Sequence, residues 1–190
     1  ASPSAGVIEE EFDPVKKAIE YEALGASALS ILTEEDFFMG SVDHLKDVKE
    51  ITTLPILRKD FMIDEYQIYE SKLIGADCIL LIASILSDQQ IEDFINVAQQ
   101  LELDYLIEVH DENELHRVEH FEDALIGTNN RNLKTFEVDL DNSVRLRNLF
   151  KEKNIFIAES GIKSREDMNY LKLNNIKVFL IGESLMRGSF

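Results

Sequence analysis

The chain has 190 residues, and its 19 Lys and Arg against 37 Asp and Glu give a formal net charge of −18 at pH 7. This charge disfavours nucleic acids and anionic membranes as partners, and neither a basic run nor an apolar stretch of about 18 residues provides an exception. Because Cys78 is the only cysteine, no internal disulfide can form, and we expect one soluble, cytoplasmic domain over residues 1–190.

Short apolar runs alternate with longer segments of helical periodicity, which is the pattern of βαβ units and a parallel sheet. The predicted strands lie, in chain order, at residues 28–32, 55–57, 78–82, 105–109, 124–127, 155–158 and 178–182. Their nearly continuous hydrophobicity indicates strands covered on both faces. The alternation predicts either an open doubly wound sheet or a β/α barrel, and composition does not decide between the two.

Capping patterns mark where the intervening helices begin and end. Helix starts are predicted at residues 13–14, 87–90 and 111–114, with a weaker pattern at 64–67. Gly25 and Gly75 each follow an apolar helical segment and precede an alanine, which is typical of a left-handed C-cap before the next strand.

Polar residues gather where the predicted strands end, which is where both architectures bind their ligands. Lys59 suits a general acid or an anion anchor, or else a surface lysine paired with Asp60. Glu108 lies within an apolar strand, where burying a carboxylate is costly without a partner, so either a salt bridge or a functional role is expected.

Three further strand ends carry polar or glycine-rich segments. Residues 129–132 offer amides and a guanidinium suited to a substrate carboxylate or hydroxyls, although a hydrogen-bonded turn accounts for them at least as well. Residues 160–161 and 182–184 each lead from a strand into a helix, and their N–H groups are suited to a phosphate, with plain glycine turns as the alternative. His116 and His120 fit a solvated helix face better than a metal site, and His110 stands isolated in the sequence.

Segments along the whole chain resemble, in order, the successive signatures of the indole-3-glycerol phosphate synthase family. They are residues 2–4, 32–41, 55–68, 107–110, 126–133, 158–162 and 180–186. The Arg-Lys-Asp-Phe block at 58–61 and the Asn-x-Arg-Asn-Leu block at 129–133 are the most specific. The resemblance implies an α/β protein with the (βα)8 TIM-barrel fold.

The resemblance also implies the reaction. The family closes the ring of 1-(2-carboxyphenylamino)-1-deoxyribulose 5-phosphate, with loss of carbon dioxide and water, to give indole-3-glycerol phosphate in tryptophan biosynthesis. It implies no metal and no organic cofactor. The expected partner is an anionic small molecule that carries a carboxylate and a phosphate, and other enzymes of the tryptophan pathway are possible partners.

By similarity, three residues are expected to act in catalysis. Lys59 would be the general acid that protonates the ketone, Glu108 would assist proton transfer and hold the lysine, and Asn129 would orient the intermediate. The resemblance implies further substrate contacts from Ser2, Phe38, Phe61, Arg131, Glu159 and Ser160. Phe38 and Phe61 would contact the aromatic ring, and the N–H groups of Gly161, Gly182 and Glu183 would bind the phosphate.

The chain departs from the family pattern at both ends. In the family a strand with a functional Glu and Lys precedes Ser-Pro-Ser, whereas this chain begins at Ala1, and Ala5 stands where a Lys is usual. At the other end, Phe190 follows closely on the phosphate-binding turn. We therefore expect a barrel that lacks its first strand and last outer helix, and little or no activity from the isolated chain.

Two other functions fit parts of the pattern. One is another phosphate-binding barrel such as phosphoribosyl anthranilate isomerase, but that family relies on a Cys and an Asp, and Cys78 does not lie at the carboxyl end of a strand. The other is a non-catalytic scaffold that retains the barrel.

Overall fold

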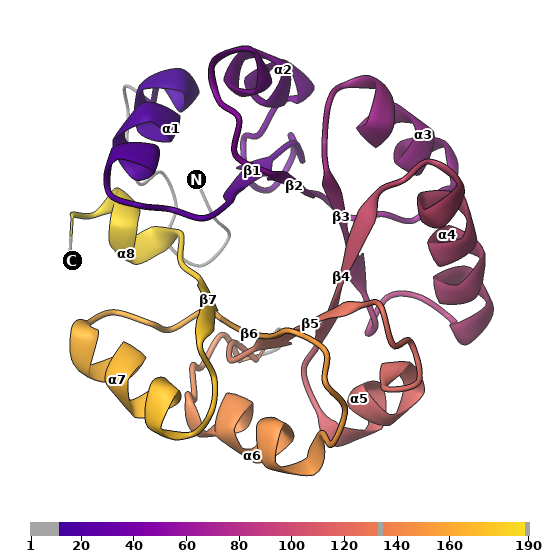
Figure 1. Ribbon diagram of the computed structural model, residues 1–190, viewed down its shortest axis with the longest axis vertical. Coiled ribbons are helices and arrows are strands. Elements are labelled where there is room, and N and C mark those ends of the chain that lie inside the picture. The colour runs from indigo at the N-terminus through magenta and orange to yellow at the C-terminus, as the bar shows by residue number, and fades with distance from the viewer. Residues whose placement is uncertain (1–11, 133–134, 189–190) are drawn as a thin grey trace. The chain divides into compact units, whose positions relative to one another are not determined.

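The structure is a computed structural model that describes residues 12–132 and 135–188. Strands and helices alternate along this part of the chain (Figure 1). It divides into two compact units, one formed by the described residues up to 81 together with 89–105, the other by residues 82–88 and the described residues from 106 onward. The expectation of a single domain stays a prediction.

The first unit alternates helices with parallel strands. Its elements are α1 (Pro14–Ala23), β1 (Leu29–Leu32), α2 (Val42–Ile51), β2 (Ile56–Lys59), α3 (Tyr66–Leu73), β3 (Cys78–Ile82) and α4 (Asp88–Gln100). Strand β2 pairs in parallel with β1 and with β3, and Leu32 of β1 lies opposite Lys59 of β2. All of β3 is buried, including Cys78. One cluster of its core contains Ala18, Leu29, Leu45, Val48, Ile56, Ile74 and Ala76.

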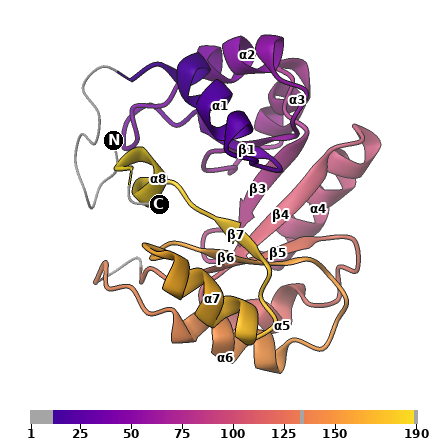
Figure 2. The same ribbon diagram turned by 60° about the vertical axis from the view of Figure 1, so that its left-hand side comes forward.

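The second unit follows the same pattern. Its elements are β4 (Asp104–Val109), α5 (Glu112–Val118), β5 (Leu125–Asn129), α6 (Asp141–Leu149), β6 (Phe156–Glu159), α7 (Arg165–Leu173), β7 (Val178–Leu180) and α8 (Glu183–Met186). Strands β4 to β7 pair in parallel in chain order. Figure 2 shows α5, α6 and α7 together on one side of β5, β6 and β7. This arrangement covers one face of the strands with helices.

All seven predicted strands are present, but their ends differ from the sequence pattern. Strand β2 continues to Lys59 and β5 continues to Asn129, two residues beyond the predicted apolar runs. Lys59 pairs with Leu32, and Asn129 pairs with Glu159, so backbone pairing extends past the last apolar side chain. Strand β7 ends early, at Leu180. Within the described residues, no helix is both long and apolar enough to cross a membrane.

The predicted glycine C-caps are confirmed at the ends of α1 and α3. Gly25 has φ +88° and Gly75 has φ +93°, both in the left-handed region. After Gly25, the Ala26 N–H donates to the Tyr21 C=O at 3.0 Å, which is the long hydrogen bond of a Schellman motif. Each helix therefore stops before the next strand by the same local geometry.

Two more helices end in this geometry without a glycine. Glu102 after α4 has φ +52°, and Asn175 after α7 has φ +62°. In each case the next N–H donates to a carbonyl five residues earlier, Leu103 to Ala98 at 2.9 Å and Ile176 to Leu171 at 3.0 Å. Sequence reasoning missed Glu102 because a non-glycine residue seldom adopts this conformation.

Two of the predicted helix N-caps are confirmed. The Asp13 carboxylate accepts from the Lys16 N–H at 3.0 Å, and the Asp111 carboxylate accepts from the Glu114 N–H at 2.9 Å, as expected of N-caps. The Ser164 side chain forms a full capping box at the start of α7, which the prediction did not include. The cap predicted at residues 87–90 stays a prediction.

Candidate active site

Lys59 occupies the last position of β2 in the first unit and is partly buried. Its C=O accepts from the Thr33 N–H at 3.1 Å, which fixes the end of β2 against the start of the loop that follows β1. Side chains alternate between the two faces of a strand, and the Arg58 guanidinium lies against α3. Lys59 therefore projects from the face opposite the helix.

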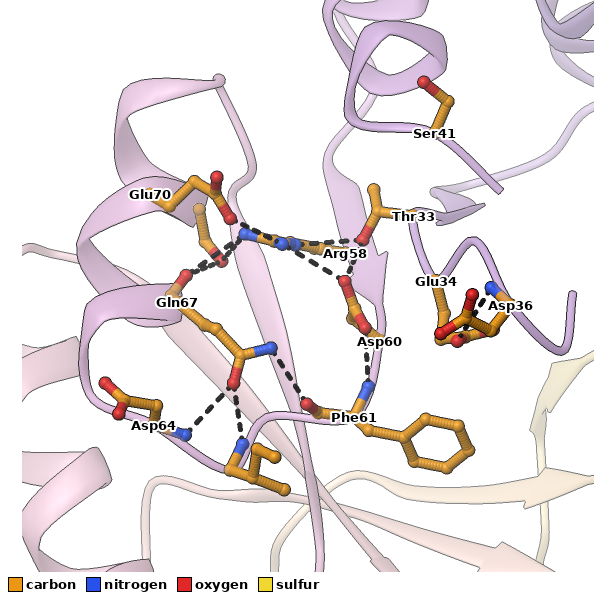
Figure 3. Close-up of polar contacts among 12 residues, drawn as sticks. Thr33, Glu34, Asp36, Ser41, Arg58, Asp60, Phe61, Asp64, Gln67 and Glu70 are labelled. Atoms are coloured by element: carbon orange, nitrogen blue, oxygen red, sulfur yellow. Dashed lines mark hydrogen bonds and ion pairs between the residues drawn. The ribbon is translucent and has the colours of Figure 1, made fainter. Parts of the chain in front are cut away.

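Arg58 is a buried cation with partners on three segments, as Figure 3 shows. Its side chain is only 3% exposed, and its Nη2 lies 3.1 Å from Asp60 Oδ2 and 2.7 Å from Glu70 Oε2. Its Nε donates to Thr33 Oγ1 at 3.0 Å. Asp60 thus forms an ion pair with Arg58, and the alternative of a surface lysine paired with Asp60 stays a prediction. A charged residue in an apolar strand was the signal that could have drawn attention to Arg58.

The loop that follows β1 carries Phe38 on a turn held by Glu34. The Glu34 carboxylate accepts from the N–H groups of Asp36, Phe37 and Phe38 at 3.1, 2.8 and 3.0 Å. The ring of Phe38 lies 6.1 Å from that of Phe61, centroid to centroid. The two residues predicted to contact an aromatic ring are thus brought together.

In the second unit, Glu108 of β4 is 2% exposed and faces β5. Its Oε1 accepts from Asn129 Nδ2 at 3.0 Å and lies 3.3 Å from His110 Nε2. The predicted catalytic residues Glu108 and Asn129 therefore contact each other directly. The Glu108 carboxylate meets both an amide and an imidazole, so it is held on two sides.

His110 lies between two carboxylates and is not isolated, contrary to the sequence analysis. Its Nδ1 lies 3.1 Å from Glu114 Oε2, which also accepts from the His110 N–H at 2.7 Å. Burial disfavours the charged imidazole, but the hydrogen bonds and charges of Glu108 and Glu114 outweigh it and raise the pKa of His110 to about 9. The i, i+4 spacing of His110 and Glu114 was the available signal.

Glu159, at the end of β6, is 2% exposed and packs beside a glycine of β5. A Cβ built at Gly127 would overlap Glu159 Oε1, so the carboxylate occupies the space that a side chain at 127 would fill. Asn129 pairs with Glu159 across the strands. Gly127 and Asn129 share one face of β5 because they are two residues apart.

Arg131 follows β5 and reaches toward the first residue of α8. Its backbone N–H donates to Asn129 Oδ1 at 2.9 Å, and its Nη2 lies 3.5 Å from Glu183 Oε2. Glu183 Oε1 also accepts from Arg187 Nε at 3.1 Å. The Glu183 carboxylate therefore pairs with two arginines. The group of Glu183 that could donate a hydrogen bond to a ligand is its backbone N–H.

The predicted phosphate-binding loops after β6 and β7 are joined by a hydrogen bond. Ser184 Oγ donates to the Ile162 C=O at 2.7 Å. Ser160 and Gly161 have φ +65° and +78°, and a Cβ at Gly161 would overlap Val138 Cγ1. Gly182 caps the N-terminus of α8. Ser2 lies outside the described residues.

A family model described as indole-3-glycerol phosphate synthase matches residues 1–189. The chain belongs to the indole-3-glycerol phosphate synthase family. An indole-3-glycerol phosphate synthase from Ruminiclostridium cellulolyticum is 50% identical over 187 residues, which cover 98% of this chain and 72% of the relative. One from Acetivibrio thermocellus is 51% identical over 187 residues, again 98% of this chain and 72% of the relative.

Two solved structures of low sequence identity share the fold of this chain. The N-acetylmannosamine-6-phosphate 2-epimerase of Clostridium perfringens matches with a TM-score of 0.70 at 15% identity. The superposed region covers 91% of this chain and 79% of the epimerase chain. The phosphoribosylanthranilate isomerase of Thermotoga maritima matches with a TM-score of 0.68 at 8% identity. The superposed region covers 90% of this chain and 82% of the isomerase chain. Both proteins are TIM-barrel-like. Of the two predicted architectures, the β/α barrel is therefore confirmed and the doubly wound sheet is not.

The family assignment settles the class of reaction. The synthase is a carboxy-lyase of tryptophan biosynthesis that forms indole-3-glycerol phosphate, as predicted. Its substrate is a small phosphorylated molecule. The likeness to phosphoribosylanthranilate isomerase concerns the fold alone, so that alternative activity is not favoured.

Proposed function

We propose that Lys59 is the general acid of the indole-3-glycerol phosphate synthase reaction. An aromatic ring carbon is a weak nucleophile, so ring closure needs a positioned acid on the carbonyl that it attacks. Lys59 ends β2 on the face opposite α3, and its neighbours Arg58 and Asp60 are held in a buried ion pair 3.1 Å long. Because both of its sequence neighbours are fixed, the Lys59 backbone is fixed as well, and its ammonium group is suited to protonate the ketone oxygen.

Glu108 assists proton transfer, and Asn129 orients the intermediate. Supporting this, the Glu108 carboxylate is almost fully buried and accepts from Asn129 Nδ2 at 3.0 Å. A buried carboxylate held by an amide has a fixed direction, which suits a group that moves a proton. Arg131, whose N–H bonds to Asn129 Oδ1, binds the substrate hydroxyls in the same part of the second unit.

The remaining substrate contacts are of two kinds, aromatic and polar. Phe38 and Phe61 contact the aromatic ring, which agrees with the 6.1 Å between their own rings. Glu159, Ser160 and Ser2 complete the polar contacts. No metal or organic cofactor enters this proposal.

The phosphate is bound by the backbone N–H groups of Gly161, Gly182 and Glu183. The Ser184 to Ile162 hydrogen bond of 2.7 Å supports this because it holds the two loops together. N–H groups at the start of a helix attract anions. The Glu183 side chain, paired with Arg131 and Arg187, does not compete with the phosphate for those N–H groups.

We further propose that the enzyme acts in the cytoplasm and associates with other tryptophan-pathway enzymes. The single, buried cysteine suits a reducing compartment. Cell fractionation tests the location. Light scattering of the synthase mixed with other purified pathway enzymes tests the association, and masses equal to those of the separate proteins would contradict it.

The position of Lys59 at the end of β2 is the observation that carries the mechanism. In the full-length protein, Lys59→Ala should lower kcat by roughly 10²–10⁴-fold while substrate binding, measured by calorimetry, is retained. Lys46, exposed on α2 and paired with Asp43 at 3.2 Å, is the matched control, and its alanine variant should keep normal kcat. A kcat for Lys59→Ala within a few-fold of the wild type would refute the assignment.

A further inference from the structure

Phe61 is the one aromatic residue of its loop, and side chains hold its backbone on both sides (Figure 3). Its N–H donates to Asp60 Oδ1 at 2.8 Å, and its C=O accepts from Gln67 Nε2 at 2.9 Å. Both polar groups of the Phe61 peptide backbone are thereby satisfied. The direction of the Phe61 Cα–Cβ bond follows from these two bonds.

Gln67 holds this loop with both the oxygen and the nitrogen of its amide. Besides the donation to Phe61, its Oε1 accepts from the N–H groups of Ile63 at 2.8 Å and Asp64 at 3.0 Å. Gln67 lies in the first turn of α3, so the loop is tied to a helix. One side chain therefore connects the aromatic residue to a regular element.

The contacts close into a ring through Arg58. Arg58 Nη2 donates to Asp60 Oδ2 at 3.1 Å, and Arg58 Nη1 donates to the backbone C=O of Gln67 at 3.2 Å. The ring runs from Arg58 through Asp60, Phe61 and Gln67 back to Arg58. Because Arg58 is 3% exposed, water competes little for these bonds.

We propose that Gln67 is a positioning residue that holds Phe61 ready to receive the aromatic ring of the substrate. The inference rests on the proposed contact between Phe61 and that ring. The Phe61 ring lies 6.1 Å from Phe38 and 6.4 Å from Phe37, so a shift of the Phe61 backbone would separate the aromatic rings. A contact that is already ordered before binding costs less to form, so losing the order raises KM.

The test is Gln67→Glu in the full-length protein. The glutamate keeps an oxygen for the N–H groups of Ile63 and Asp64 but cannot donate to the Phe61 C=O. Arg58 keeps its bond because that bond goes to the backbone of residue 67. KM should rise about 3- to 10-fold, the equivalent of one hydrogen bond, and kcat should stay within about twofold.

Two controls separate positioning from added charge. Gln89→Glu adds the same charge on the exposed face of α4, where Gln89 Nε2 donates to Asp93 Oδ1 at 2.9 Å, and KM should not change. Gln67→Glu is also measured on a Phe61→Ala background, where it should raise KM no further. If Gln67→Glu does not fold, as judged by circular dichroism and thermal unfolding, Gln67→Met replaces it. Methionine also loses the acceptor for the Ile63 and Asp64 N–H groups, so KM should rise at least as much, and no further on the Phe61→Ala background.

The outcomes distinguish this inference from the proposal on which it rests. If Phe61→Ala raises KM but Gln67→Glu does not, the positioning role is wrong and the Phe61 contact stands. If Gln67→Glu raises KM equally with and without Phe61, its effect is one of charge and the inference is wrong. If Phe61→Ala leaves KM unchanged, both the proposed contact of Phe61 with the aromatic ring of the substrate and the positioning role of Gln67 are wrong.

Discussion

His110 provides a pH-dependent contribution to stability that can be measured directly. Glu108 Oε1 and Glu114 Oε2 lie 3.3 and 3.1 Å from its ring nitrogens. They raise its pKa from 6.5 to about 9, against the opposing effect of burial. Since the folded state binds the proton more tightly, the contribution is full below pH 6.5 and disappears as the pH rises through 9.

The magnitude follows from these two values. A pKa of about 9 in the folded protein and 6.5 in the unfolded chain corresponds to about 3 kcal/mol at pH 6, about 2 kcal/mol at pH 7.5 and almost nothing at pH 9.5. His110→Asn removes the titrating group and keeps a polar side chain of similar size. Its deficit in the free energy of unfolding should therefore shrink as the pH rises.

Urea unfolding of the wild type and His110→Asn at these three pH values measures the deficit. Comparing the two proteins at each pH cancels groups that titrate alike in both. Glu114→Gln, which removes one of the two carboxylates beside the imidazole, should show a smaller deficit with the same pH trend. A deficit for His110→Asn that stays constant from pH 6 to 9.5 would refute the imidazolium between Glu108 and Glu114.

Three other substitutions test the backbone and the glycine beside Glu159. Gly25→Ala should lower the free energy of unfolding by about 1–2 kcal/mol, because a Cβ there meets no neighbour and the φ of +88° alone causes the cost. Glu102→Gly, at φ +52°, should raise it by about 0.5–1 kcal/mol in urea unfolding, and a loss of stability would contradict the strain argument. Gly127→Ala should lower kcat at least tenfold by displacing the Glu159 carboxylate, and should have no further effect on a Glu159→Gln background; equal effects on both backgrounds would show that it acts elsewhere.

Much of the fold could be predicted from local signals. The apolar runs located every strand to within two or three residues, and Gly25 and Gly75 correctly marked two helix ends. These signals act over a few neighbouring residues, so they are present in the sequence whatever the rest of the chain does. The family signatures likewise identified the reaction and the residues proposed to carry it out.

The polar networks could not be predicted in this way. Arg58 meets Thr33 from the loop after β1 and Glu70 from α3, and the Glu108 carboxylate accepts from Asn129 of the neighbouring strand. The worth of a charged side chain depends on burial and on partners many residues away, such as the 21 residues that separate Glu108 from Asn129. Hydrophobic period and caps therefore determine where the elements lie, whereas tertiary structure alone decides which charges are buried and which groups hold them.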